Sequence, residues 1–180
     1  DLFIFEKKVF CSIGRLTRQK NYLELIKAFE NFSKTNFNNT NLIILGKGED
    51  EKILKNYIIE KKINNCFLLG FKENPYKYLS NSSLYISSSL WEEPGHTLIE
   101  AGYLNVPILT SDCPNGPREM IIHNKNGFKY KMKNTEDLEY KLTEISKLSN
   151  EELFKVKLNM KKTISSFTEY QFSKKIKNYL

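Results

Sequence analysis

Two carboxylates are the first candidates for chemistry because a glycine turn separates them. Glu92 and Glu100 flank Pro94-Gly95 in the stretch LWEEPGHTLIEA. A short apolar segment precedes this stretch, and the residues after the glycine have the pattern of a helix. A helix start presents free N–H groups and about half a unit of positive charge, which suits a phosphorylated ligand. We therefore expect both carboxylates to reach a ligand seated at this turn.

Carboxylates at this spacing admit more than one kind of chemistry. They can accept hydrogen bonds from sugar or ribose hydroxyls, each worth roughly 1.5–3 kcal/mol. They can also form the acid/base pair of a glycosidase, which must flank the bond that it cleaves. One carboxylate at the helix start and one inside the helix favour hydroxyl binding. Two glutamates so spaced are also common on helix surfaces, so the pair alone is a weak signal.

A second candidate group lies in the loop after the first predicted strand. Arg15 and Lys20 are five residues apart there, directly after Gly14. Arginine offers a planar fork for paired phosphate oxygens, and lysine offers a point charge. Glycine lets the backbone approach a ligand closely. The pair predicts an anion clamp, with two solvated loop cations as the alternative.

Short apolar strands alternate with helical segments along the chain. The strands are predicted at 9–13, 41–45, 66–69, 84–87, 106–110 and 126–130. The helices are predicted at 21–37, 49–62, 75–79, 97–104, 117–122, 135–148, 150–167 and after 168, with caps at Asn74-Pro75, Thr135, Ser149 or Asn150, and Thr168. This alternation predicts an α/β fold: a doubly wound, Rossmann-like parallel sheet of about six strands, with helices on both faces and extra C-terminal helices. Ligands of such sheets bind beyond the carboxyl ends of the strands.

Composition narrows the class of protein. The chain has 180 residues and a formal net charge of +7, which fits solubility, an anionic ligand or an anionic membrane surface. It has no run of 18 apolar residues and no nucleic-acid motif, so we predict no spanning helix and no nucleic-acid partner. The start has no signal peptide but also no Met, which suggests a cytoplasmic protein and a piece of a longer chain.

Cysteines and histidines give no sign of a metal. Cys11, Cys66 and Cys113 lie in or beside apolar runs without a C-x-x-C pattern, so we predict buried free thiols. His96 and His123 lack metal-ligand spacing. We therefore predict no structural metal and no cofactor.

The motifs SIGRL, ILGKG, FLLGF, LWEEPGHTLIEA and VPILTSDCPNGPRE, in this order, resemble the C-terminal half of a GT-B glycosyltransferase. They are most similar to the large retaining family 4 of nucleotide-sugar transferases. The resemblance covers residues 9–180. It implies a single domain over 1–180, with a leading segment 1–8, a Rossmann-like core 9–130 and C-terminal helices 135–180. In this family the domain binds the nucleotide-sugar donor, and an N-terminal domain, missing here, binds the acceptor.

The resemblance also assigns roles to residues. Arg15 and Lys20 would hold the donor diphosphate, Glu92 the sugar hydroxyls and Glu100 the ribose, with Phe71 beside the base. Arg15, Lys20 and Glu92 would form the catalytic set. Backbone amides from Gly95 to Leu98 would meet the sugar and the diphosphate. The complete implied donor-binding set is Gly14, Arg15, Lys20, Phe71, Glu92, Gly95, His96, Thr97, Leu98 and Glu100.

Some residues depart from the family pattern. His96 replaces a large apolar residue; it could touch the sugar or phosphate, and we favour packing beside Trp91. Glu93 is a second acid, but the seven residues between Glu92 and Glu100 select Glu92. Arg118, in the unusual PNGPRE loop, could add a phosphate contact. The last predicted helix would leave Phe172, Ile176 and Tyr179 partly exposed.

The resemblance implies a retaining, metal-independent hexosyltransferase that builds a surface glycan from a UDP-sugar. The isolated domain would bind the donor without turnover. We expect it in the cytoplasm, with a peripheral contact to an anionic membrane as an option. The alternatives are a non-catalytic nucleotide-binding or scaffolding module, and half of a GT-B UDP-sugar epimerase.

Overall fold

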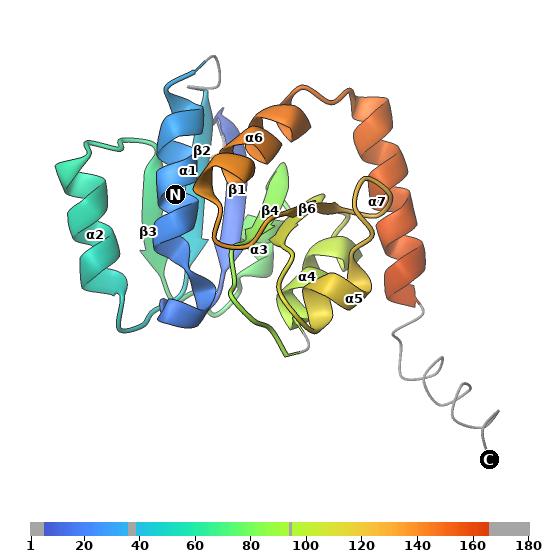
Figure 1. The fold of residues 1–180 in the computed structure, drawn as a ribbon, viewed down its shortest axis with the longest axis horizontal. Helices are drawn as coiled ribbons and strands as arrows, with labels where there is room; N and C mark the ends of the chain where they lie inside the picture. Colours follow the sequence, from blue (N-terminus) through green and yellow to red (C-terminus); the bar gives the residue numbers. More distant parts are fainter. Residues whose placement is uncertain (1–5, 36–38, 94, 166–180) are drawn as a thin grey trace.

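The computed structural model describes residues 6–35, 39–93 and 95–165 of the chain. Within these ranges the strands form one parallel sheet of six, in the order β3-β2-β1-β4-β5-β6 (Figure 1). The strands are β1 (Lys8–Ile13), β2 (Thr40–Leu45), β3 (Cys66–Gly70), β4 (Leu84–Ser87), β5 (Ile108–Ser111) and β6 (Phe128–Tyr130). The predicted doubly wound α/β architecture is confirmed.

Helices cover both faces of the sheet. They are η2 (Arg18–Lys20), α1 (Tyr22–Ser33), α2 (Glu51–Glu60), α3 (Tyr76–Leu79), α4 (His96–Tyr103), α5 (Gly116–Met120), α6 (Thr135–Ser146) and α7 (Asn150–Ser165). Consecutive strand residues point to opposite faces, so each strand serves two cores. Phe10 and Leu42 join the core under α1, α2 and α6, whereas Cys11 and Ile43 join the core under α3, α4 and α7.

The predicted core positions agree with this packing. Tyr22, Leu25, Ile26, Phe29 and Phe32, which recur at helical spacing in α1, are all buried. The three cysteines are buried and free, as their apolar surroundings predicted. Burial raises the pKa of the Cys11 thiol to about 12, so it stays protonated and inert at neutral pH. No helix among the described residues has the length and apolar character needed to span a bilayer.

Several predicted boundaries are wrong by a few residues. Strand β5 begins at Ile108, not at 106, because Pro107 has no N–H for the ladder; its carbonyl accepts from the Tyr85 amide instead. Strand β6 begins at Phe128, because the Asn126 side chain bonds to the main chain at Met120 and Ile122 rather than extending the strand. Helix α1 ends at Ser33 and α2 spans only Glu51–Glu60.

The helix caps also differ in part from the predictions. Pro75 alone occupies the N-cap of α3, and Tyr76 is the first helical residue. Asn134 caps α6 by accepting from the Asp137 amide at 2.8 Å, so Thr135 is already inside the helix. Ser149 caps α7 as predicted: its hydroxyl accepts the Glu152 amide, and the Glu152 carboxylate accepts the Ser149 amide. Phe167, the Thr168 cap, Phe172, Ile176 and Tyr179 lie outside the described residues.

Candidate functional site

The loops that carry the predicted site residues meet where the strand order reverses. Strands β1 and β4 are neighbours in the sheet although β2 and β3 separate them in sequence. The connections that follow them, η2 and the β4–α4 loop, therefore leave the same edge in opposite directions (Figure 1). In doubly wound sheets, the crevice that binds the ligand lies at such a reversal point.

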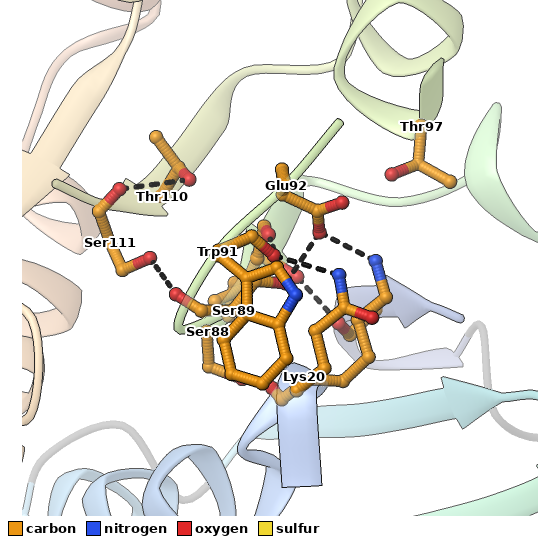
Figure 2. Close-up of polar contacts among 12 residues, drawn as sticks. Lys20, Ser88, Ser89, Trp91, Glu92, Thr97, Thr110 and Ser111 are labelled. Carbon is orange, nitrogen blue, oxygen red and sulfur yellow. Dashed lines mark hydrogen bonds and ion pairs between the residues drawn. The ribbon is translucent and has the colours of Figure 1, made fainter. Parts of the chain in front are cut away.

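Lys20 and Glu92 form an ion pair at this reversal point. The Lys20 Nζ lies 2.5 Å from Oε1 of Glu92, and the Ser89 hydroxyl donates to the same oxygen at 2.5 Å (Figure 2). Glu92 is only 6% exposed, whereas Glu93 is exposed to solvent. Both contacts end on Oε1 and leave Oε2 outside them. The structure thus brings together two residues that are 72 positions apart in sequence and were predicted from separate motifs.

Hydrogen bonds to main-chain carbonyls fix the two loops against each other. The Ser88 hydroxyl donates to the Lys20 carbonyl at 2.6 Å, and the Leu90 amide donates to the Gln19 carbonyl at 2.8 Å. The Gln19 side chain donates to the Trp91 carbonyl at 2.9 Å. Sequence reasoning missed Gln19 and the serines, although the run Ser87–Ser89 at the end of a buried strand was a signal of polar contacts there. These bonds hold Lys20 and Glu92 in place before any ligand arrives.

The glycines of this edge allow close backbone contact. A Cβ on Gly46, whose φ is +140°, would lie 1.9 Å from the Gly14 carbonyl oxygen. A Cβ on Gly14 would lie 2.9 Å from the Tyr22 hydroxyl and 3.0 Å from Cε of Lys20. The loops after β1 and β2 therefore touch through their main chains, and the Lys20 stem lies directly over Gly14.

Arg15 follows Gly14 in the chain and lines a neighbouring cavity. It is exposed and lines a cavity of about 470 Å³ between the ends of β1, β2 and β3, together with Lys47, Phe71 and Pro75. The Phe71 ring is 67% exposed. The predicted Arg15–Lys20 clamp is thus two adjacent groups: Lys20 is held by Glu92, and Arg15 faces the neighbouring cavity.

Glu100 has a partner that the sequence did not suggest. The Tyr76 hydroxyl donates to Oε1 of Glu100 at 3.2 Å, which joins α3 to α4. The nearby Glu100 carboxylate raises the pKa of the Tyr76 phenol. Tyr76 directly follows Asn74-Pro75, so a tyrosine on the first turn of a predicted helix was the available signal. The two carboxylates of the opening motif therefore have separate partners, Lys20 for Glu92 and Tyr76 for Glu100.

Some polar groups at the start of α4 already have hydrogen-bond partners within the protein. Gly95 has a φ of +79°, which favours glycine at this N-cap. The Leu98 amide donates to the Gly95 carbonyl at 2.9 Å, so it already has an acceptor, and the Leu98 side chain is in the core. The Thr97 hydroxyl accepts from Tyr85 at 2.7 Å. His96 is exposed and Trp91 is 46% exposed, and their packing against each other stays a prediction.

Histidine, cysteine and acidic side chains do not gather into a metal-binding group anywhere in the described ranges. The positive charges at the reversal point come instead from Lys20 and Arg15. A protein cation beside a buried carboxylate suits a ligand that carries both anionic oxygens and hydroxyl groups.

The strand order and the loops at its reversal define a Rossmann-like ligand-binding domain. Residues 3–163 match the family model described as "Glycosyl transferases group 1", and the chain belongs to this family. This confirms the class that the motifs resembled.

Curated relatives are longer than this chain. It is 44% identical over 114 residues to an uncharacterised glycosyltransferase of Methanocaldococcus jannaschii. The aligned segment covers 63% of this chain and 28% of that protein. It is 34% identical over 134 residues to the poly(glycerol-phosphate) alpha-glucosyltransferase of Bacillus subtilis. This alignment covers 74% of this chain and 20% of that protein. The chain therefore spans less than a third of either relative.

Solved structures share the fold. A mutant of TarM from S. aureus, crystallised with fondaparinux, alpha-GlcNAc-glycerol and UDP, matches with a TM-score of 0.87 and 25% identity, over 96% of this chain and 35% of that one. Anabaena HepE in complex with UDP and glucose matches with a TM-score of 0.85 over 98% of this chain and 50% of that one; at 18% identity this likeness concerns the fold alone.

Proposed function

We propose that this chain is the donor-binding domain of a retaining glycosyltransferase that transfers a sugar from a UDP-sugar to a surface-glycan acceptor. The observation that carries the proposal is the Lys20–Glu92 pair at the reversal point of the sheet. It places a cation for phosphate oxygens within 2.5 Å of a carboxylate suited to sugar hydroxyls. An N-terminal acceptor-binding domain would complete the enzyme, which we place in the cytoplasm, with peripheral membrane contact as an option.

The pair would work by exchanging partners. A donor diphosphate would compete with Glu92 for the Lys20 ammonium, and Arg15 would approach the same phosphates from beyond Gly14. Glu92 would present Oε2, which accepts neither the Lys20 nor the Ser89 hydrogen bond, to the sugar hydroxyls. As the bond to the sugar breaks, the two cations would stabilise the negative charge that develops on the departing nucleotide. These cations would serve without a metal ion.

The nucleoside would occupy the side of the crevice towards β3. The cavity of about 470 Å³ there has an exposed aromatic ring, Phe71, beside which a base can stack. Glu100 would accept the ribose hydroxyls, and Tyr76 would hold its carboxylate in position through the bond that joins α3 to α4. Amides of Gly95, His96 and Thr97 would meet the sugar and diphosphate at the start of α4.

Relatives support the acceptor class and the nucleotide. Their names include a poly(glycerol-phosphate) alpha-glucosyltransferase, a poly(ribitol-phosphate) alpha-N-acetylglucosaminyltransferase and a diphospho-undecaprenol N-acetylgalactosaminyltransferase. TarM was crystallised with UDP. The acceptors in the three names all carry phosphate groups.

Thermal unfolding with UDP, GDP, ADP and several UDP-sugars tests the proposal. A ligand at about 100 times its Kd should add ~2.7 kcal/mol to stability, and we expect UDP compounds to do so. Lys20→Ala and Arg15→Ala should each abolish most of this gain, whereas Lys155→Ala, in an exposed ion pair on α7, should not. An unchanged UDP shift in both site variants would refute the diphosphate assignment.

Turnover separates the proposal from its rivals. These 180 residues on their own should hydrolyse a UDP-sugar no faster than background. Epimerisation of the UDP-sugar without acceptor would favour the epimerase alternative. A scaffolding module would show no nucleotide-dependent stabilisation at all.

A further inference from the structure

A second, positively charged pocket lies farther along the same edge of the sheet. The loop after β5, the helix α5 and the end of β6 enclose about 490 Å³, and Asp112, Arg118, His123, Lys129 and Lys131 line it. We call this the β5–β6 pocket. It shares no lining residue with the cavity that holds Arg15 and Phe71. The proposed donor roles leave it without a ligand.

The cations of this pocket outnumber its carboxylate. The Lys129 Nζ lies 3.1 Å from Oδ1 of Asp112, and the Arg118 Nε lies 3.6 Å from the same oxygen. These are charge contacts only, since Oδ1 has no partner with hydrogen-bond geometry. One carboxylate thus serves two cations, and Lys131 adds a third. A surplus of positive charge in a concave site favours an anion.

The charged groups are held where a ligand could use them. The Arg118 Nη2 donates to the Asp112 carbonyl at 2.8 Å, which fixes the guanidinium while its side chain stays 56% exposed. The Lys131 amide donates to Asp137, and this anchors the chain beside the exposed Lys131 side chain. An arginine held in this way can still offer its remaining N–H groups to phosphate oxygens.

His123 adds a neutral donor to the pocket. Its Nδ1 accepts the Lys129 amide at 2.9 Å, so the single proton of the neutral ring resides on Nε2. Burial, then the charge of Lys141, lowers the pKa of His123, with Lys129 acting in the same direction and Glu144 and Asp137 opposing it. Neutral imidazole with a free N–H complements phosphate oxygens without adding charge repulsion among the cations.

The order of the strands indicates which anion this is. Along the edge come the cavity at β3-β2-β1, the Lys20–Glu92 pair at β1-β4, and then the β5–β6 pocket. The isolated bridge between Glu92 and Asn115 and the bond from the Ser111 hydroxyl to the Ser89 carbonyl join the last two. Adjacent strands are about 4.8 Å apart, so β6 is roughly 10 Å beyond β4. If the nucleoside occupies the first site and the diphosphate and sugar the second, the third lies on the acceptor side of the sugar.

We propose that the β5–β6 pocket binds a phosphate group of the acceptor, so that the substrate class is a phosphate-bearing glycan or polyol chain. This inference rests on the proposed function, because that function sets the order of nucleoside, sugar and acceptor along the edge of the sheet. Arg118 and Lys131 supply the charge-assisted contacts, His123 supplies a neutral donor, and the Asp112 carbonyl holds the guanidinium. The phosphate serves to position the acceptor and takes no part in bond breaking.

Isothermal titration of the UDP-saturated chain at low salt tests this, with glycerol 3-phosphate as the probe and glycerol as the uncharged control. We expect glycerol 3-phosphate to bind while UDP is present and glycerol not to bind. Arg118→Ala and Lys131→Ala should each weaken the probe about tenfold or more and leave the UDP affinity unchanged. Lys155→Ala, from an exposed ion pair elsewhere, should change neither.

The outcomes separate the two proposals. If saturating UDP eliminates probe binding, or if both variants bind the probe like the parent, the pocket is not an acceptor-phosphate site. If UDP itself fails to bind but glycerol 3-phosphate binds in an Arg118-dependent way, the donor assignment fails and the anion site stands. Arg118-dependent binding to phosphatidylglycerol vesicles without binding of the soluble probe would identify a membrane contact and overturn the acceptor proposal.

Discussion

Two lysine–carboxylate contacts at one edge of this sheet differ in how fully their charges are matched. Lys20 and Glu92 approach to 2.5 Å, and their side chains are only 16% and 7% exposed. Lys129 and Asp112 approach to 3.1 Å, the Asp112 side chain is 42% exposed, and Arg118 shares the same carboxylate. The first site is a buried one-to-one pair. The second is an open cluster with more cations than anions.

The difference teaches how each site would meet an anion. At the first site the phosphates of a ligand would compete with Glu92 for the Lys20 ammonium, while its hydroxyls would donate to the Glu92 carboxylate. The first site therefore favours a ligand that carries both phosphate and hydroxyl groups. At the β5–β6 pocket no exchange is needed because positive charge is in surplus, and any suitably placed phosphate gains from it.

The largest effect should come from the main-chain contact that supports the buried site. Gly46→Ala would place a Cβ 1.9 Å from the Gly14 carbonyl oxygen at a φ of +140°, so the loops after β1 and β2 must separate. We expect a loss of at least about 3 kcal/mol in the free energy of unfolding, because strain and overpacking act together. Urea denaturation measures it. A loss under about 1 kcal/mol would show that these loops do not depend on each other.

Breaking the buried pair should cost slightly less. Lys20→Met keeps the stem over Gly14 but leaves the buried Glu92 without its cation, which should cost roughly 3 kcal/mol. Arg118→Ala is the matched change in the open cluster and should cost less than about 0.5 kcal/mol, since its pair is exposed and Lys129 remains. Both are measured by urea denaturation at one pH.

A double variant sharpens the same comparison. Lys20→Met combined with Glu92→Gln should recover much of the loss, since no buried charge is then left alone. If Lys20→Met and Arg118→Ala cost the same, burial does not distinguish the two contacts, and the contrast drawn between the sites is wrong.

The sequence predicts the sheet well because apolar periodicity and strand-end glycines are local signals. Strand β4 was placed without error at 84–87, whereas β5 was placed two residues early because the missing N–H of Pro107 matters only once a neighbouring strand is known. Asn134 rather than Thr135 caps α6 for a similar reason: both residues can cap, and only the backbone angles decide between them.

Charged residues of the candidate site could be chosen from the sequence, but their pairings and their uncharged partners could not. Arg15, Lys20, Glu92 and Glu100 were chosen by type and by position after strands. The Lys20–Glu92 contact joins residues 72 positions apart and depends on β1 and β4 being neighbours, which periodicity cannot reveal. The bond between Tyr76 and Glu100 was missed for the same reason, since it joins two helices across the edge. The β5–β6 pocket could not be predicted either. The sequence singled out Arg118 alone, and only the folded chain brings Lys129 and Lys131 to the same pocket.

The smallest effect should be a pH dependence confined to the open cluster. The pKa of His123 is lowered from its ordinary value of 6.5, chiefly by burial. In acid the unfolded chain therefore binds a proton at this histidine more readily than the folded chain does. Stability should fall as the pH drops through 6.5, and this loss is complete once the pH lies below the folded pKa.

His123→Asn isolates that contribution. An asparagine oxygen can accept the Lys129 amide in place of Nδ1 but does not titrate, so the variant should lose less stability than the parent between about pH 7.5 and pH 5.5. Glu30 and Glu51, whose pKa values are lowered from 4.5 in the folded chain, lose their contributions only at more acidic pH. Urea denaturation across this range measures the difference. Parallel curves for parent and variant would mean that His123 titrates alike in the folded and unfolded chain; it would then carry a charge in mildly acidic solution, and the neutral donor assigned to the β5–β6 pocket would be absent there.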